Sequence, residues 1–391
     1  MKESQVENEI KRQAAPLSLL PALVLHTMTL ITFMLSFLPK TVQSYVSTMM
    51  IGGLFGLMIP PFFLWHYCLQ KLIWDDQWTN SIYMLLLIGY YVSVYFENKY
   101  LFSRRNKNRG CLRSPTNWIE KRSVSFWSTH LDYFPFQLTI KDKNNHDKTK
   151  EETEKSNAQY IFAVHPHGIH CWPLNLFSMF GSPLDTSISS SFNNIVSGKR
   201  TTQLCANVLF WIPVVRELFY VSGYVPAARP IAQSIMELSH KSIVVCTGGE
   251  EESMHTTVGK DIYVLKNRKG FVRLALQYGA SLVPVIGLEN NDMFSTYPTI
   301  LTNLRFWILK TMGLALPIFH GLYVITPLPY RQRLNIVIGE PIHISPEHLC
   351  PRDKYDKPPS DIVDIYHSKY IDAVKQLHKQ HAKNGRSLEI I

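Results

Sequence analysis

Charge is missing from long stretches near the start of this sequence. No Asp, Glu, Lys or Arg occurs in residues 13–39, 41–70 or 77–96. A membrane helix needs about 20 mostly apolar residues, and the first two stretches exceed that length. A cleaved signal peptide is excluded, because the first stretch is too long, lacks a small-residue cleavage site and is followed at once by another apolar stretch. The sequence therefore predicts an integral membrane protein.

Several catalytic and binding motifs are also missing. The six cysteines form no C-x-x-C pair, which argues against a disulfide framework or a zinc ribbon. The sequence has no G-x-S-x-G elbow, no G-x-x-x-x-G-K-[ST] loop, no G-x-G-x-x-G turn and no H-E-x-x-H pair. The acyltransferase pattern of His, four residues and Asp is absent where two histidines follow a predicted strand, because the fifth residue after His165 is His170 and the fifth after His167 is Trp172. These absences leave serine hydrolases, nucleotide-binding enzymes and zinc proteases without support.

Basic residues flank the apolar region on both sides. Lys11 and Arg12 precede it, and a cluster follows it in which Glu120 is the single acid: Arg104, Arg105, Lys107, Arg109, Arg113, Lys121 and Arg122. Such flanks mark the cytosolic side and favour an even number of crossings. A nucleic-acid site is disfavoured, because no recognition motif accompanies the cluster. We expect a polar tail over residues 1–13, a membrane-embedded helical region over 14–100 and a cytosol-facing domain over 101–391.

The rest of the chain alternates between strand and helix patterns. Apolar runs predict strands over residues 136–140, 160–165, 242–246, 282–286 and 334–338. Helical spacing lies between them, with Gly279 as a helix stop. A final amphipathic helix is expected over Ser360–His381, with Ser360 as its N-cap. Such alternation predicts an α/β domain with a mostly parallel sheet.

The most informative motif is His165-Pro166-His167-Gly168, which follows the predicted strand 160–165. Imidazole is the usual proton acceptor near neutral pH, and open α/β folds keep their sites at the carboxyl ends of strands. Packed histidines are the plainer alternative. A metal site with His170 and Cys171 is disfavoured, because no acidic or thiolate partner stands at a convincing spacing. We predict no metal.

Two further elements could contribute chemistry. Gly248-Gly249 follows a predicted strand, and its exposed backbone amides could hold an oxyanion, while a nearby carboxylate could orient an imidazole. Arg268, Lys269 and Arg273 stand at the start of a predicted helix, where basic side chains suit phosphate groups. A plain turn and a solvated helix face are the corresponding alternatives.

Seven motifs in order resemble the type-2 diacylglycerol acyltransferase family, which also holds monoacylglycerol and wax-alcohol acyltransferases. They are Asp132-Tyr133-Phe134-Pro135, His165-Pro166-His167-Gly168, Pro213-Val214-Val215-Arg216-Glu217 with Ser222-Gly223, Gly248-Gly249 with Glu252-Ser253, Arg268-Lys269-Gly270-Phe271 through Pro284, Gly339-Glu340-Pro341, and Tyr366-His367. Three features depart from the family pattern. Thr247 replaces the usual Pro, the Glu of the G-E-N element is displaced at Glu289-Asn290-Asn291-Asp292, and the N-terminal region holds more apolar sequence.

The resemblance implies an acyl-CoA-dependent O-acyltransferase that converts diacylglycerol to triacylglycerol without a covalent acyl-enzyme. It implies a glycerolipid-acyltransferase-like fold in the endoplasmic reticulum membrane, with the lipid-droplet surface as a further location. Acyl-CoA is the co-substrate and no cofactor is expected. The oligomeric state is left open, with a homo-oligomer as one option.

The resemblance also implies roles for individual residues. Plant members carry E-P-H-S at the histidine motif, so His167 is expected to be the base, with His165 and Glu252 in support. Gly168, Gly248 and Gly249 are expected near the oxyanion, and Arg268, Lys269 and Arg273 near acyl-CoA. Two alternatives stay open: an enzyme for monoacylglycerol, a long-chain alcohol or a lysophospholipid, and an inactive lipid-binding scaffold.

Overall fold

A computed structural model describes residues 31, 34–56, 85, 88–93, 95, 129–141 and 159–177, and residues 201–391 except 213–214, 222, 240, 314, 323–327, 352–356 and 384. Among these residues, none of the helices combines the length and the apolar character needed to cross a membrane. The predicted tail over residues 1–13, much of the predicted membrane region and the basic cluster over 104–122 lie outside the described residues.

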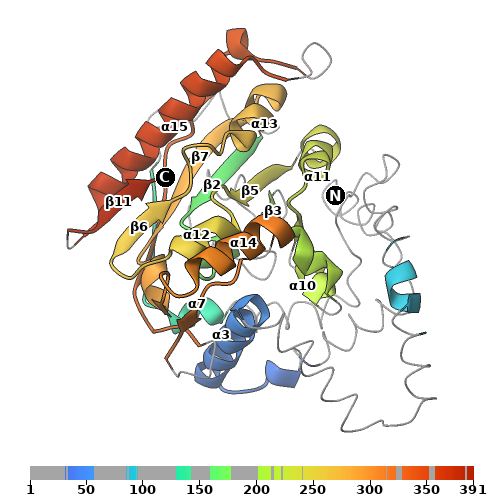
Figure 1. Ribbon diagram of the computed structural model, residues 1–391, viewed down its shortest axis with the longest axis vertical. Coiled ribbons are helices and arrows are strands. Elements are labelled where there is room, and N and C mark those ends of the chain that lie inside the picture. Colours follow the sequence, from blue (N-terminus) through green and yellow to red (C-terminus); the bar gives the residue numbers. More distant parts are fainter. Residues whose placement is uncertain are drawn as a thin grey trace, which may run out of the picture.

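A seven-stranded sheet forms the centre of the domain (Figure 1). In order across the sheet its strands are β1 (Phe136–Ile140), β10 (Leu334–Ile338), β7 (Ser281–Leu288), β2 (Tyr160–His165), β5 (Ser242–Cys246), β3 (Thr201–Cys205) and β4 (Tyr224–Pro226). Only the β10–β7 pair is antiparallel. The central strands β2 and β7 are buried along their whole length, as expected for a sheet that is covered on both faces. The predicted α/β class with a mostly parallel sheet is confirmed.

Alternation along β2 shows which elements cover each face of the sheet. The Phe162 ring lies 5.1 Å from that of Phe177 in η2 (Trp172–Phe177), on one face. On the other face, the Tyr370 hydroxyl of α15 (Ser360–His381) donates to the Ala163 carbonyl. Successive side chains of a strand point to opposite faces, so His165 shares the α15 face with Ala163. Figure 1 shows α15 running along the outer edge of the domain.

Most predicted elements occur with their predicted bounds, and β7 extends beyond its predicted range. Helix α15 begins at Ser360, but its N-cap is Pro359 rather than the predicted Ser360, because the residue before the first helical residue takes that position. The apolar stripe of α15 is buried as its spacing predicts. Helix α13 (Gly270–Tyr278) ends at Gly279, which takes the left-handed conformation at φ 66°, as expected of a C-terminal glycine.

Short paired strands that the sequence patterns did not predict, together with further helices, complete the fold. Strand β11 (Ser387–Ile390) pairs in parallel with β6 (Lys260–Tyr263), and β8 (Ser295–Thr296) pairs with β9 (Phe319–His320). The remaining described helices are α3 (Lys40–Gly56), α7 (His130–Tyr133), η3 (Asn207–Trp211), α10 (Val215–Val221), α11 (Arg229–Ser234), η4 (Ile235–Ser239), α12 (Glu250–His255), η5 (Asn290–Met293), α14 (Thr302–Met312) and η6 (Pro346–His348).

Part of the apolar N-terminal region contacts the α/β domain. The Tyr45 ring of α3 lies 5.2 Å from the Tyr133 ring of α7 in an edge-to-face arrangement, and Ser47 and Thr129 share a buried hydrogen bond of 3.0 Å. Figure 1 shows α3 and α7 side by side at the lower end of the view. The apolar N-terminal region therefore packs directly against the segment that leads into β1.

Candidate active site

The His165–Gly168 loop turns sharply at the carboxyl end of β2. Gly168 has φ +61°, a conformation that only glycine adopts readily. A Cβ atom at this position would lie 2.5 Å from Asn290 Nδ2. Glycine is therefore required here both by the backbone conformation and by the close approach of a neighbouring side chain.

The first histidine of the loop is enclosed by protein. His165 has no exposed surface, and its ring stacks on Tyr263 with centroids 4.9 Å apart. Because the Tyr370 hydroxyl already donates to Ala163, it can only accept from His165 Nε2, at 3.1 Å. Thr247 Oγ1 also lies 3.0 Å from Nε2. The polar atoms of this ring are thus directed at protein groups and away from any substrate.

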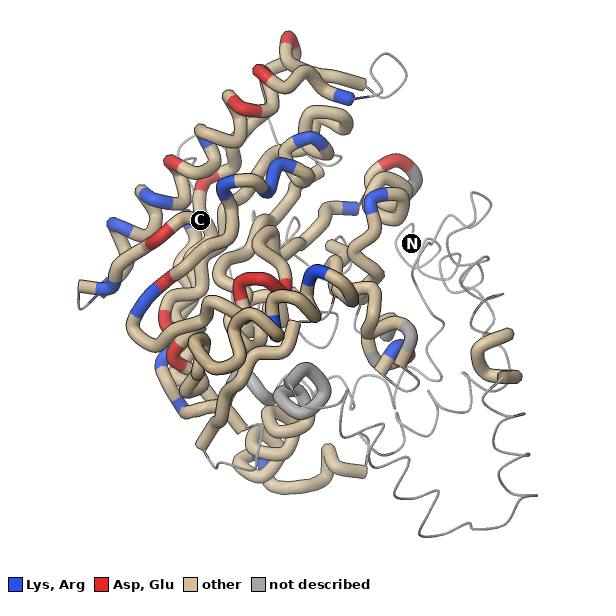
Figure 2. Tube along the Cα trace, viewed as in Figure 1, with Lys and Arg blue, Asp and Glu red and all other residues tan. Residues whose placement is uncertain are grey.

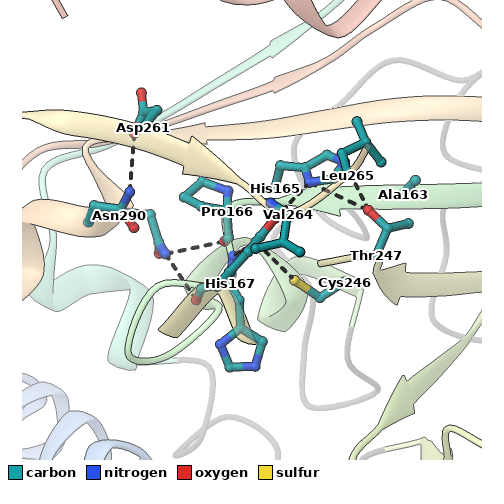
Figure 3. A network of polar contacts seen from close by, with 12 residues as sticks. Ala163, His165, Pro166, His167, Cys246, Thr247, Asp261, Val264, Leu265 and Asn290 are labelled. Carbon is teal, nitrogen blue, oxygen red and sulfur yellow. Dashed lines mark hydrogen bonds and ion pairs between the residues drawn. The ribbon is translucent and has the colours of Figure 1, made fainter. Parts of the chain in front are cut away.

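The second histidine is arranged differently. His167 Nδ1 lies 2.8 Å from the Gly168 carbonyl oxygen. A carbonyl can only accept, so Nδ1 carries the proton and, in the neutral ring, Nε2 keeps its lone pair. Figure 3 shows the His167 ring pointing away from the polar network around His165, and the residue lines a cavity. An imidazole nitrogen with a fixed tautomer at a cavity wall suits a general base.

The buried Glu252 carboxylate supports this loop from behind. Its Oε2 accepts from the backbone N–H of His167 at 2.6 Å, and its Oε1 accepts from the backbone N–H of Val264 at 2.9 Å. Oε1 also lies 3.5 Å from His165 Nδ1. Charge-assisted bonds of this length are strong. Glu252 therefore holds His167 through the main chain, whereas a carboxylate near the paired glycines was expected to orient an imidazole.

The paired glycines make room for Glu252. A Cβ on Gly248 would lie 2.0 Å from Glu252 Oε1, and Gly249 has φ 61° and ψ −159°, a region open essentially to glycine alone. The Gly249 amide already donates to the Cys246 carbonyl at 3.1 Å. Three glycines were expected to donate their backbone N–H groups to the oxyanion. The N–H of Gly249 is already used in a hydrogen bond within the protein.

Asn290 holds the loop from the opposite side, a role that no sequence motif predicted. Its amide nitrogen lies 3.4, 3.3 and 3.2 Å from the carbonyl oxygens of Pro166, His167 and His170, and its oxygen accepts from Trp172 N at 3.3 Å. An amide can donate and accept at once, so one side chain fixes both ends of the turn. The only sequence signal was its place after β7.

The cavity beside His167 has a volume of about 780 Å³. Its wall is mostly apolar, with residues from β3, β5, α12 and α14, and it includes the thiols of Cys171, Cys205 and Cys246. Burial raises the pKa of Cys205 to about 12 and that of Cys246 well above its ordinary value. Both thiols therefore stay protonated near neutral pH, and a protonated thiol is a poor nucleophile.

The three basic residues expected near acyl-CoA have different surroundings. Arg268 lines the cavity and pairs with Glu251 at 2.6 Å. Lys269, the N-cap of α13, pairs at 2.6 Å with Asp364 of α15, and this contact lowers the pKa of Asp364. Arg273 is exposed on α13. The structure thus places Arg268 at the cavity and Lys269 at a contact between two helices.

The positions of the histidines do not support the alternative of a metal site. His165 faces α15 and His167 faces the cavity, so the two rings do not converge. Within the described part of the chain, no group of three His, Cys, Asp or Glu side chains could hold a metal ion.

Comparison with known proteins now identifies the family. The sequence matches the family described as diacylglycerol acyltransferase over residues 81–388. The chain belongs to this family. Human diacylglycerol O-acyltransferase 2 is 30% identical over 74% of this chain and 70% of that protein, and the Xenopus tropicalis protein of that name is 32% identical over 67% and 68%. Human 2-acylglycerol O-acyltransferase 3 is 29% identical over 82% and 89%.

Membership in the diacylglycerol acyltransferase family makes the protein an acyltransferase. Among solved structures, 1-acyl-sn-glycerophosphate acyltransferase PlsC from Thermotoga maritima has a TM-score of 0.34 and 10% identity, covering 89% of this chain and 100% of that one. This likeness is too distant to support an inference about function.

Proposed function

We propose that this acyltransferase transfers the acyl group of acyl-CoA to the free hydroxyl of diacylglycerol, producing triacylglycerol and CoA. One observation carries the proposal: His167 Nδ1 donates to the Gly168 carbonyl, which leaves Nε2 available at the wall of an apolar cavity. The names of the related diacylglycerol O-acyltransferases support the choice of acceptor.

In this mechanism His167 Nε2 removes the proton from the acceptor hydroxyl as its oxygen attacks the thioester carbonyl carbon. The carbonyl oxygen becomes an oxyanion, for which the amides of Gly168 and Gly248 are the proposed donors. The tetrahedral intermediate collapses, the C–S bond breaks, and the His167 imidazolium returns the proton to the CoA sulfur. Glu252 and Asn290 hold the His165–Gly168 loop in position throughout the reaction.

Direct transfer, without an acyl-enzyme, is favoured by the state of two cavity thiols, Cys205 and Cys246, and of the Ser253 hydroxyl. A covalent route would need a nucleophile activated by a neighbouring base. Cys205 and Cys246 have raised pKa values, and the Ser253 hydroxyl donates to the Glu250 carbonyl rather than to an imidazole. None of these groups is activated in the way that a covalent route requires.

A panel of acceptors tests the proposal. Purified protein with labelled acyl-CoA should form triacylglycerol from diacylglycerol, and His167→Ala should abolish that product. Preference for monoacylglycerol, a long-chain alcohol or a lysophospholipid would replace the substrate assignment while keeping the chemistry. Lipid binding without turnover on any acceptor would favour the inactive scaffold.

We also propose that the catalytic domain faces the cytosol from the endoplasmic reticulum membrane, because basic residues flank the apolar region on both sides. Protease protection of N- and C-terminal tags in sealed microsomes tests this orientation. Both tags should be digested without detergent. A protected C-terminal tag would contradict the orientation and the access to cytosolic acyl-CoA.

A further inference from the structure

The segment between Asp292 and Glu340 has an unusual charge pattern. It contains no acidic residue, while its basic residues are Arg305, Lys310, Arg331 and Arg333. The pattern has a counterpart in Figure 2, where α14 and the loop before it carry blue but no red. A surface of one sign suits a partner of the opposite sign, such as anionic headgroups.

Helix α14 within this segment has two apolar faces. Phe306, Leu309, Lys310 and Gly313 line the cavity beside His167. On the other face, Leu304 is 50% exposed and Trp307 is 59% exposed. A helix that covers a core normally presents polar residues on its outer side. The exposed apolar side chains on the outer face of α14 therefore favour an apolar environment. The inner face borders the cavity beside His167.

The loop before α14 presents its apolar side chains at a conformational cost. Leu301 has φ 50°, which is uncommon for a residue other than glycine, and its side chain is 62% exposed. The buried Arg305 holds the loop in place, because its guanidinium donates to the carbonyls of Tyr297, Pro298 and Ile300. An exposed leucine in a strained conformation indicates a functional constraint, since neither feature stabilises the isolated domain.

We propose that Tyr297–Leu301 and the outer face of α14 lie in the interfacial layer of a lipid bilayer. Leu301, Leu304 and Trp307 would enter the acyl-chain region, while Lys310, which lines the cavity and is exposed near the end of the helix, meets the phosphate groups. A bilayer fits better than a protein partner, because the face combines aliphatic and aromatic side chains with positive charge alone. The contact brings the cavity wall to the membrane, so a lipid acceptor can enter from the bilayer. This last step rests on the proposed function, whereas the contact itself does not.

A depth measurement tests the contact independently of activity. Leu301→Cys is labelled with an environment-sensitive fluorophore in the full chain, reconstituted in phosphatidylcholine and phosphatidylserine vesicles that carry nitroxide lipids. The matched control is Ile365→Cys, on an apolar residue 44% exposed on α15, and the protein without added cysteine corrects for labelling of native thiols. The nitroxide lipids should quench the label at 301 and spare the label at 365.

Two results would overturn the proposal. Quenching of the 301 label by aqueous iodide, as at 365, would place the loop in water. Protection from both iodide and nitroxide lipids would mean that a second copy or another part of this chain covers the face.

A kinetic measurement links the contact to substrate entry. Leu301→Ser with Trp307→Ser should raise the apparent KM for long-chain diacylglycerol in vesicles by about tenfold or more, since each buried side chain contributes appreciably to partitioning. The KM for a short-chain diacylglycerol dispersed in water should change little, and Ile365→Ser should leave both unchanged. An equal fold-change in KM for both acceptors in the double variant would contradict lateral entry. A protein that acylates neither acceptor would refute the proposed function, and the labelling result would still decide the bilayer contact.

Discussion

His165 and His167 stand two residues apart at the same strand end, yet their surroundings differ in every respect that matters for catalysis. The His165 ring is fully buried, stacked on Tyr263 and directed at protein groups. The His167 ring has one nitrogen held by a carbonyl and the other available at a cavity. The α15 side of the strand end is therefore a closed polar core, and the cavity side, on which we place the reaction, is open.

The difference arises from the period of the strand. His165 is the last residue of β2 and continues the face that packs against α15, so its surroundings are those of a core residue. His167 lies past the strand, where Gly168 turns the chain, and the periodicity no longer determines its direction. Identical side chains thus acquire a structural role at His165 and the proposed catalytic role at His167 from one turn of backbone.

The largest effect is expected when the His167 imidazole at the cavity is removed. His167→Ala should lower kcat by about 100-fold to 10,000-fold, the usual contribution of general-base catalysis. His165→Gln should retain much more activity, because an amide can still donate to the Tyr370 hydroxyl while the cavity side is untouched. Rates of triacylglycerol formation, compared at equal amounts of membrane-inserted protein, check both. An active His167→Ala enzyme beside an inactive His165→Gln enzyme would reverse the two roles.

His165→Glu gives a sharper version of this test. The family resemblance predicts that a carboxylate at this position keeps measurable activity. The new carboxylate would lie close to Glu252, because His165 Nδ1 is 3.5 Å from Glu252 Oε1. Two carboxylates at such a distance share a proton, so the activity of the variant should fall as pH rises, relative to the wild type. A pH profile of kcat parallel to that of the wild type would contradict this arrangement.

The next effect concerns Asn290, which holds the open side in place. Asn290→Ala removes the donor to three carbonyls, and misplacement of the base should lower kcat on the order of tenfold to a hundredfold with a smaller change in KM. Asn335→Ala is the matched control, because Asn335 is also in the sheet region but bonds to Glu289. Equal losses of kcat in the two variants would indicate a general effect on folding.

The sequence predicted the strands and helices around this site better than the hydrogen bonds within it. Strand bounds and the stripe of α15 follow from periodicity, because they depend on burial of whole faces. The position of His167 at a strand end follows as well. The main-chain partners of Glu252 and the contacts of Asn290 do not, because they depend on loops of different strands meeting in space. The R-K-G-F motif likewise predicts one role for Arg268 and Lys269. In the fold, Arg268 pairs with Glu251 and Lys269 pairs with Asp364.

A smaller effect should separate these two basic residues. Arg268→Ala should raise the KM for acyl-CoA by about tenfold, the size of one charge-assisted hydrogen bond to a phosphate, because Arg268 borders the cavity. Lys269→Ala should change that KM less, because Lys269 pairs with Asp364 on α15. Initial rates over a range of acyl-CoA concentrations check both. A larger increase for Lys269→Ala would place the CoA phosphates on the α15 side.

The smallest effect concerns the closed side and its response to pH. His367 of α15 is 4% exposed, and burial lowers the pKa of its ring below the ordinary value of 6.5, although its Nε2 donates to the Leu265 carbonyl at 3.0 Å. Above pH 6.5 the ring is neutral in both the folded and the unfolded chain. Between pH 6.5 and the lower folded pKa, the unfolded chain binds a proton that the folded protein does not, so the free energy of unfolding decreases as pH falls through this window.

The melting temperature in detergent should therefore fall between pH 7.5 and pH 5.5, and the fall should be smaller in His367→Gln, whose side chain does not titrate. His343→Gln, on an exposed histidine, controls for the loss of any imidazole and should leave the fall unchanged. A fall equal to that of the wild type in His367→Gln would mean that other groups cause the acid sensitivity. The assignment matters for the comparison of the two sides, because Leu265 follows Val264, whose amide binds Glu252. The titration of His367 therefore takes place one residue away from a main-chain contact of Glu252, which also binds the His167 amide.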